Sequence, residues 1–185
     1  MENTSTEKKQ GGLKEIVRFT ITAVIIIFIV RIYIAQPFVV NGASMDPTFA
    51  SNDYLIVDEL SYRFEEPKRE DVIIFRYPRN TSTFFIKRII GLPGETVIMQ
   101  NGDIIIKNKD NIQGMKIEDN HVENSRRTND TFSISLGPTE YFVMGDNRAQ
   151  SSDSRSWGPL ERKYIIGRPI TRLLPFSKIA LFPGK

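Results

Sequence analysis

Hydrophobic and polar positions divide the chain into an apolar N-terminal segment and a long remainder of short alternating runs. Residues 1–15 are polar, and the stretch that follows, Ile16 to Val40, is apolar at most positions. From residue 36 onward, short runs rich in Ile, Val, Phe and Tyr are separated by Gly, Pro, Asn and Asp. This alternation is typical of strands joined by turns. The pattern therefore predicts one mainly β domain over residues 36–185.

Individual strands and turns follow from the same pattern. The dipeptide Asn101-Gly102 lies between two apolar runs and predicts a hairpin whose two turn residues have positive φ. Residues 109–130 are polar and are predicted to form a long exposed connection. The predicted strands are Phe38–Val40, Tyr54–Val57, Val72–Tyr77, Phe84–Ile90, Thr96–Met99, Ile104–Lys107, Thr131–Ser135, Tyr141–Met144 and Tyr164–Leu173.

The apolar N-terminal segment predicts a single transmembrane anchor over residues 16–35. Its uninterrupted centre, Phe19 to Val30, has only 12 residues, whereas a spanning helix needs about 20. The prediction therefore requires Arg31 to reach the membrane interface. A cleavable secretory signal is the alternative, but Ala35-Gln36-Pro37 is a poor cleavage site because proline would follow the cut.

Basic residues predict the orientation of this anchor. Lys8, Lys9, Lys14 and Arg18 come before the apolar centre, and no lysine or arginine lies between positions 32 and 62. Because positive charge favours the cytoplasmic side, residues 1–15 are predicted to be a cytoplasmic leader. Residues 36–185 are then an extracytoplasmic domain, and the chain is a single-pass protein of the cell membrane.

Composition narrows the chemistry that the chain can perform. Its 185 residues are 40% hydrophobic and 25% charged with a net charge of +3, which indicates neither disorder nor a strongly basic nucleic-acid binder. The chain has no cysteine, so disulfides and thiol catalysis are excluded. A Ser-His-Asp triad would have to use His121, the single histidine, which lies in the polar stretch 109–130. We therefore expect any serine nucleophile to use a different base.

Ser44 and Lys87 are candidates for such a pair. Ser44 lies in the small-residue turn 41–48, which by itself is typical of an ordinary surface loop. Strand alternation places Lys87 on one face with Phe85 and Ile89. Burial among apolar side chains lowers the pKa of lysine and yields a neutral amine that can accept a proton from a hydroxyl. The alternative is an edge-strand lysine that reaches solvent.

A polar stretch, Gly145 to Gly158, follows the apolar run that ends at Met144. It alternates acidic, basic and hydroxyl side chains, which suits either a solvated turn or a set of groups that brace a site. A serine in this stretch can hydrogen-bond a neutral lysine and orient it.

Four blocks of the chain resemble type I signal peptidases, the bacterial membrane-bound serine proteases with a Ser/Lys dyad. The stretch between Lys87 and Gly145 is short, and in this it resembles the compact members of the family found in Gram-positive bacteria. With the anchor, the blocks cover residues 16 to about 158. They are Gly42-Ala43-Ser44-Met45-Asp46-Pro47-Thr48, Asn52-Asp53-Tyr54-Leu55-Ile56-Val57, Lys87-Arg88-Ile89-Ile90-Gly91-Leu92-Pro93-Gly94-Glu95, and Gly145-Asp146-Asn147-Arg148 continuing through Ser151, Asp153-Ser154-Arg155 and Gly158.

The resemblance implies a role for each matching residue and an antiparallel β-sheet fold. It makes Ser44 the nucleophile and Lys87 the general base, and it makes Ser151 the hydroxyl that hydrogen-bonds and orients the lysine. It implies neither a metal nor an organic cofactor. Residues expected to brace the loops are Asp153, Arg155, Asp146 and Arg88, and residues expected to line the substrate pockets are Phe38, Val40, Asn41, Met45, Phe85 and Ile86.

The implied substrates are exported preproteins, bound as an extended strand, with small residues at the first and third positions before the cut. The implied partners are thus these preproteins and the lipid bilayer, with no nucleic acid. The chain departs from many relatives at Gly42, where they carry a hydroxyl, and at Glu70, where they often carry glycine. Two alternatives stay open: a LexA-like self-cleaving Ser/Lys protease, and a catalytically inactive membrane-tethered binding domain.

Overall fold

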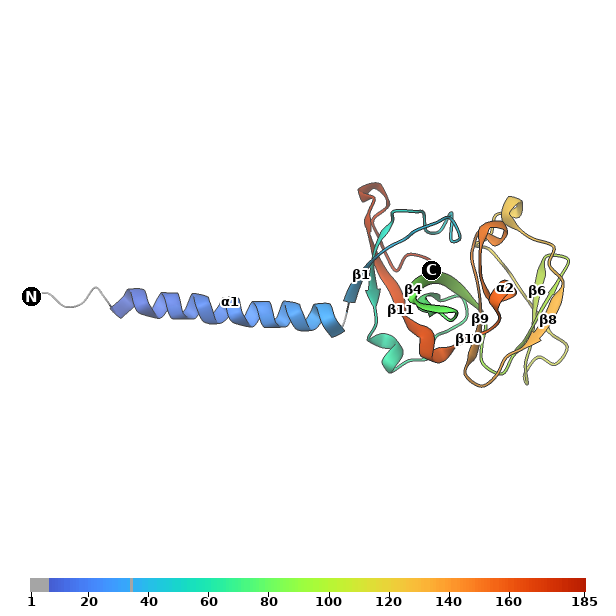
Figure 1. The fold of residues 1–185 in the computed structure, drawn as a ribbon, viewed down its shortest axis with the longest axis horizontal. Helices are drawn as coiled ribbons and strands as arrows, with labels where there is room; N and C mark the ends of the chain where they lie inside the picture. The colour runs from blue at the N-terminus through green and yellow to red at the C-terminus, as the bar shows by residue number, and fades with distance from the viewer. Residues whose placement is uncertain (1–6, 34) are drawn as a thin grey trace, which may run out of the picture.

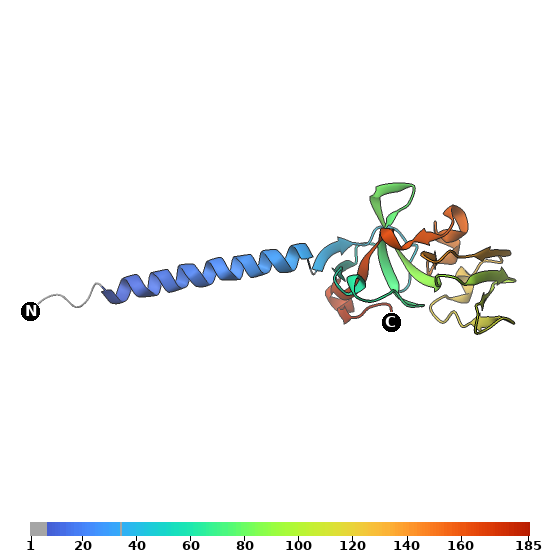
Figure 2. The same ribbon diagram turned by 90° about the horizontal axis from the view of Figure 1, so that it is seen from below.

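The molecule consists of one long helix and a β-rich body. The structure, a computed structural model, describes residues 7–33 and 35–185. Helix α1 (Glu7–Tyr33) projects from the body at the point where strand β1 (Ala35–Val39) begins (Figure 1). The same separation is visible after a quarter turn (Figure 2). Of the predicted anchor and leader, positions 1–6 and 34 lie outside the described residues.

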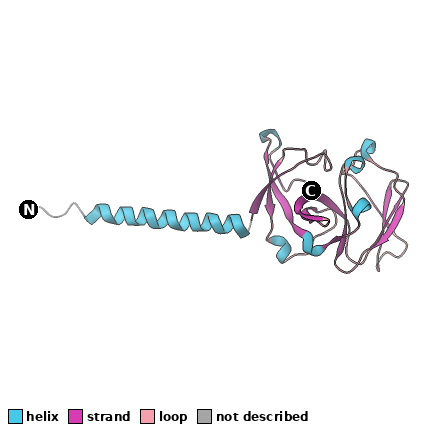
Figure 3. Ribbon diagram, viewed as in Figure 1, coloured by secondary structure: helices cyan, strands magenta, loops and turns pink. Residues whose placement is uncertain are grey.

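Two antiparallel sheets form the body, and strands dominate it (Figure 3). The larger sheet has the order β1-β2-β11-β3-β4-β9-β10, with β12 beside β11, and the smaller has the order β7-β6-β5-β8. The predicted mainly β, antiparallel fold is confirmed. The strands after β1 are β2 (Tyr54–Asp58), β3 (Val72–Tyr77), β4 (Asn80–Gly91), β5 (Thr96–Gln100), β6 (Asp103–Lys107), β7 (Met115–Ile117), β8 (Phe132–Ser135), β9 (Glu140–Met144), β10 (Leu160–Glu161), β11 (Ile165–Leu174) and β12 (Ala180–Leu181).

Every predicted strand is present, with boundaries that differ by a few residues. The hairpin between β5 and β6 is confirmed, because Asn101 has φ 53° and Gly102 has φ 83°. The pattern missed the short strands β7, β10 and β12. Strands of two or three residues are too short to show a period of two.

Helix α1 covers most of the predicted anchor, but its membrane crossing is not confirmed. None of the helices within the described ranges is both long enough and apolar enough to span a bilayer. Apolar side chains of the described part of α1 nevertheless face outward, and those of Ile16, Phe19, Val24 and Ile27 are exposed. The transmembrane anchor over residues 16–35 stays a prediction.

Most of the stretch 109–130 is exposed, as its polar composition predicts, but the stretch also takes part in the fold. It contributes β7 to the smaller sheet, and the side chains of Asp119 and Val122 are buried. Asp119 forms an ion pair with Arg148, which follows β9. Asp119 is therefore paired inside the fold while most of its polar neighbours face water, which composition alone could not reveal.

Three apolar clusters hold the sheets together and position the site. One packs β3, β4 and β9 around Ile73, Ile89 and Val143, and another fills the smaller sheet. The third lies beneath the turn 41–48 and includes Met45 and Phe49. Glu70 has φ 71°, a left-handed conformation that glycine adopts most easily, so glycine would fit this position with less strain.

Candidate active site

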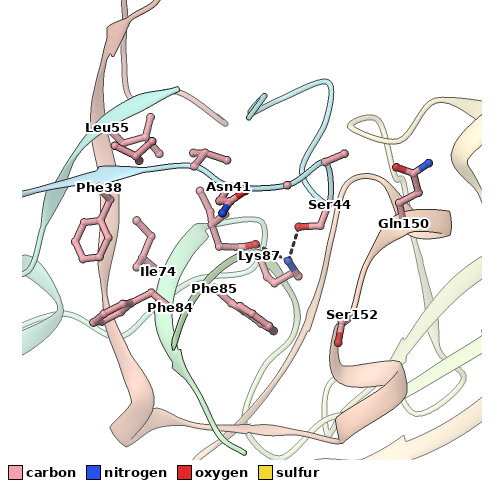
Figure 4. A pocket seen from close by; sticks show the side chains of 15 residues that line it. Phe38, Asn41, Ser44, Leu55, Ile74, Phe84, Phe85, Lys87, Gln150 and Ser152 are labelled. Carbon is pink, nitrogen blue, oxygen red and sulfur yellow. Dashed lines mark hydrogen bonds between the residues drawn. The ribbon is translucent and has the colours of Figure 1, made fainter. Parts of the chain in front are cut away.

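The fold brings the turn 41–48 against the middle of strand β4. Lys87 Nζ lies 2.6 Å from Ser44 Oγ, although the two residues are 43 positions apart in the chain. Figure 4 shows both side chains pointing toward each other across this contact. The predicted pairing of a serine hydroxyl with a lysine amine is thus present in the structure.

The setting of Lys87 is apolar. Its side chain is buried, with 3% of the residue exposed, and Nζ lies 5.3 Å from the centre of the Phe85 ring. Its second hydrogen bond goes to the carbonyl oxygen of Ile86 at 2.9 Å. Burial lowers the pKa of Lys87 to about 8, and the charges of Asp153 and Asp146 oppose that shift only in part. At this pKa the amine is readily deprotonated at mildly alkaline pH.

Asp146 and Arg88 hold the turn 41–48 in place. Arg88 donates from Nε to Asp146 Oδ1 at 2.9 Å and from a terminal nitrogen to Oδ2 at 2.7 Å. This bidentate pair is almost fully buried. Asp146 also accepts a hydrogen bond from the Thr48 hydroxyl at 2.5 Å, and the next residue, Asn147, donates its backbone N–H to the Ser44 carbonyl at 3.0 Å. The contacts join the polar loop after β9 to the middle and the last residue of the turn.

Asp153 and Arg155 hold the shape of the same loop. Asp153 accepts a hydrogen bond from the Gly145 backbone at 3.1 Å and pairs with Arg155 at 2.8 Å. Arg155 in turn donates to the carbonyl of Arg148 at 2.6 Å. A β-carbon at Gly145 would collide with the Ser44 carbonyl oxygen and the Ser151 hydroxyl, so the close approach of the loop to the turn requires glycine.

Contacts from the stretch 109–130 complete this brace, and the sequence analysis missed them. Arg155 donates to Thr128 Oγ1 at 2.8 Å and to Asp130 Oδ2 at 2.7 Å. Arg126 donates to both the carbonyl and the carboxylate of Asp46, two residues after Ser44. The only sequence signal was the density of charged residues in a segment without periodicity, and such segments are usually solvated.

Ser151 does not make the predicted hydrogen bond to Lys87. Its hydroxyl is buried and finds no hydrogen-bond partner among the described residues. It lies instead close to Gly145 and the Ser44 carbonyl. The expectation assumed that the loop would turn this hydroxyl toward the amine, whereas Lys87 is oriented by Ser44 and by the Ile86 carbonyl.

A cleft of about 260 Å³ leads away from the Ser44–Lys87 pair. Five of the six predicted pocket residues line it, and Figure 4 shows Phe38 and Asn41 on its walls. Met45 is the exception. It is 1% exposed and belongs to the core cluster under the turn, because the residue after Ser44 points to the opposite side. The five that line the cleft are Phe38, Val40, Asn41, Phe85 and Ile86.

Other lining residues were not predicted. Leu55 and Ile74 come from β2 and β3, and Phe84 comes from β4. Gln150 and Ser152 lie at the opposite end, on the Lys87 side (Figure 4). The alternation of β4 indicated a second face containing Phe84 and Ile86, but nothing in the sequence indicated that Leu55 and Ile74 would meet that face.

The strand segments on either side of the cleft have free edges. Within the part of the chain that the structure describes, β1 pairs only with β2. Residues 84–87 of β4 pair only with β3, since the ladder to β9 covers residues 88–91. Each pairing from β1 through β2, β11 and β3 to β4 is antiparallel, so β1 and β4 run in the same direction. Both free edges can accept hydrogen bonds from and donate them to an extended chain.

Gly42 leaves one side of the cleft open. It has φ 96°, and a β-carbon built there would meet no atom within 4 Å. Neither Gly42 nor its neighbour Ala43 supplies a side-chain hydroxyl to the cleft. The Ser44 backbone N–H donates to no backbone carbonyl of the described residues and is available to a ligand. His121 does not line the cleft.

The fold and the site together define an antiparallel β protein that holds a serine hydroxyl against a buried amine at the end of an apolar cleft. Comparison with known proteins identifies the family to which the chain belongs. Residues 13–174 match the family described as signal peptidase, peptidase S26, and the chain belongs to this family. The prediction of a serine endopeptidase that removes signal peptides is confirmed at the level of the family, which decides against the LexA-like alternative.

Several relatives match nearly the whole chain. The chain is 33% identical to signal peptidase I of Bacillus licheniformis, covering 96% of this chain and 97% of the relative. It is 31% identical to a probable signal peptidase I-2 of Synechocystis, covering 90% and 76%. A crystal structure of a signal peptidase I from Enterococcus faecalis V583 is similar with a TM-score of 0.48 and 28% identity, covering 56% of this chain and 97% of that chain.

Proposed function

We propose that this chain cuts exported preproteins after their signal peptides, with Ser44 as nucleophile and Lys87 as general base. The observation that carries the proposal is the 2.6 Å contact between Lys87 Nζ and Ser44 Oγ, made where burial lowers the pKa of the amine to about 8. A neutral amine at this distance can remove the hydroxyl proton, which an ordinary lysine at neutral pH cannot do.

The reaction has two halves that use the same amine. In the first, Lys87 takes the proton of Ser44 while Oγ attacks the scissile carbonyl, and the resulting ammonium then donates that proton to the departing amine. The free Ser44 N–H stabilises the negative oxygen of the tetrahedral intermediate. In the second half, Lys87 removes a proton from water as the water oxygen attacks the acyl-enzyme. The resulting ammonium returns that proton to Ser44 Oγ as the ester bond breaks and the signal peptide is released.

The substrate binds as an extended strand between the free edges of β1 and β4. Ser44 follows the carboxyl end of β1, and Lys87 follows residues 84–86 on β4. The apolar part of the cleft extends from these residues back toward Phe38. Small residues before the cut therefore lie toward Phe38, so the substrate runs in the same direction as both strands. The large side chains that line the small cleft admit only small residues at the first and third positions.

Helix α1 is the membrane anchor of this enzyme, with the N-terminus in the cytoplasm and residues 36–185 outside. The proposal is supported by the outward-facing apolar side chains of residues 13–27 and by the lysines that precede them. Exposed apolar surface of this extent is unfavourable in water and favourable in lipid. After membranes carrying the full chain are washed at alkaline pH, we expect the protein to stay in the pellet. Quantitative release into the supernatant would contradict the anchor.

The catalytic proposal is tested by cleavage of a preprotein with membranes that contain the chain or its variants. Ser44→Ala and Lys87→Ala should each reduce cleavage by about 10³-fold or more, because each removes a group on which the chemistry depends. Lys107→Ala, which changes an exposed lysine of β6, should leave the rate unchanged. Circular dichroism checks that all three variants fold. Full activity of Lys87→Ala would overturn the dyad, and no cleavage by the wild-type chain would favour an inactive binding domain.

A further inference from the structure

A second cavity lies behind one wall of the cleft. The rings of Phe38 and Phe84 meet edge to face with centroids 5.4 Å apart. Both residues line the cleft and also a separate cavity of about 310 Å³. The ring pair is therefore the wall that the two cavities share. The polar residues of the second cavity are Gln36, Glu59, Tyr62, Arg63, Arg76 and Arg162.

The charges around this second cavity do not balance. Three arginines face one carboxylate, that of Glu59. Arg162 has a carboxylate partner outside the lining, Glu66, at 3.0 Å. Neither Arg63 nor Arg76 forms an ion pair within 4.0 Å in the described part of the chain. The guanidinium of Arg76 lies 4.9 Å from the centre of the Phe84 ring, at the shared wall. An excess of positive charge is thus present where the cavity meets the cleft.

The proposed binding mode leads the substrate to this cavity. A substrate parallel to β1, with its third residue before the cut beside Phe38, continues back along β1 toward Gln36. Gln36 precedes Phe38 by two residues, and parallel strands advance by the same distance per residue, about 3.3 Å. The fifth residue before the cut therefore lies beside Gln36, and the fifth and sixth lie at the mouth of the second cavity.

We propose that this arginine-lined cavity is an additional substrate subsite, which binds an acidic side chain at the fifth or sixth position before the cut and disfavours a basic one. The inference rests on the proposed function and its strand direction. An acidic side chain there gains the charge of Arg63 and of Arg76, whose guanidinium groups have no carboxylate within 4.0 Å among the described residues, although Arg76 donates a hydrogen bond to the Thr81 carbonyl at 3.0 Å. A lysine there meets like charge. The enzyme would thus select substrates by side-chain charge in this cavity, in addition to selecting small side chains next to Ser44.

Three preproteins that differ only at these two positions test the subsite, with Asp, Asn or Lys at both. For the wild-type chain, kcat/KM should be about three- to fivefold higher for the Asp substrate than for the Lys substrate, as is typical of partly exposed charge pairs. Arg76→Glu should reverse the order. Because the side chain of Arg76 is exposed, this variant is expected to fold, and its rate on the Asn substrate verifies that the dyad is intact.

Arg79→Glu is the matched control, since it changes an exposed arginine near the same hairpin that does not line the cavity. It should keep the wild-type preference. Equal cleavage of all three substrates by the wild-type chain and by Arg76→Glu would overturn the subsite while leaving the proposed function intact. A failure of the wild-type chain to cut any of them would instead overturn the proposed function. If Arg76→Glu slows all three equally in phosphatidylglycerol vesicles and not in phosphatidylcholine vesicles, the cavity serves lipid headgroups and the subsite is wrong.

Discussion

Strand β4 carries two buried basic side chains, one on each face, and they differ in their partners. Lys87 and Arg88 are neighbours in the chain, and both are nearly inaccessible, at 3% and 1% exposure. Arg88 has a bidentate partner in Asp146 and also donates to the carbonyls of Glu70 and Gly184. Lys87 has only a hydroxyl, a carbonyl and an aromatic ring. Burial is the same on both faces, and the partners differ.

This difference separates a cation that must stay charged from an amine that can become neutral. A guanidinium cannot lose its proton in a protein. A buried arginine without a partner therefore lowers the free energy of unfolding, because its charge is isolated from water. An amine without a carboxylate partner can lose its proton instead, and its pKa decreases. Asp146 and Asp153 influence the pKa of Lys87 from a distance, yet neither forms a direct ion pair with it among the described contacts. Exposure alone would not have distinguished the two residues.

The largest expected effect comes from replacing Lys87 by arginine, the residue type of its neighbour Arg88. Lys87→Arg keeps a positive charge at the site but removes the ability to become neutral, so cleavage should decrease by about 10³-fold or more. The measurement is kcat/KM on a preprotein, with circular dichroism to show that the variant folds. A variant that retained a tenth of the activity would show that loss of a proton at position 87 is not required.

Replacing each cation by methionine should change stability in opposite directions. Arg88→Met leaves Asp146 buried and unpaired and should lower the free energy of unfolding by about 3–5 kcal/mol. Lys87→Met removes an unpaired buried charge and should raise it by about 2 kcal/mol at pH 7. The folded pKa of Lys87, about 8, lies below the ordinary 10.5, so the folded chain binds fewer protons between these values. The increase in the free energy of unfolding that Lys87→Met produces is therefore full below pH 8 and disappears above pH 10.5.

Denaturant titrations of the full-length chain in detergent, at pH 7 and at pH 10.5 or above, measure both effects. Destabilisation by Lys87→Met at pH 7, similar to that of Arg88→Met, would contradict the comparison. It would mean that the lysine is held by contacts as favourable as those of the arginine.

The pH dependence of the wild-type enzyme is a further expected effect, and it requires no substitution. Because only the neutral amine can act as base, kcat/KM should rise about tenfold for each pH unit below the pKa of Lys87. The profile should level near pH 8, the value to which burial lowers that pKa. Initial rates in overlapping buffers between pH 6 and 10 measure this profile. A rate independent of pH over that range would argue against Lys87 as the base.

Residues close together in the chain show how much the sequence alone predicted. The period of two in 84–90 placed Lys87 with Phe85 and Ile89, and the structure confirms that apolar setting. Asn101-Gly102 predicted its hairpin because the turn requires positive φ at both positions. The blocks around Ser44, Lys87 and Gly145 indicated the family, which the comparison confirms. Each of these signals depends on neighbouring residues or on local backbone conformation.

Contacts between distant segments were decided by the tertiary structure. The turn of Ser44 meets Lys87 because the sheet carries β1 and β4 to opposite sides of one cleft. Met45 points into the core, the Ser151 hydroxyl makes no hydrogen bond to the amine, and residues of the stretch 109–130 pair with the loop that braces the site. A period of two in the sequence assigns a side chain to a face of its own strand. Which side chains meet across that face depends on how the sheets close, and only the folded chain determines it.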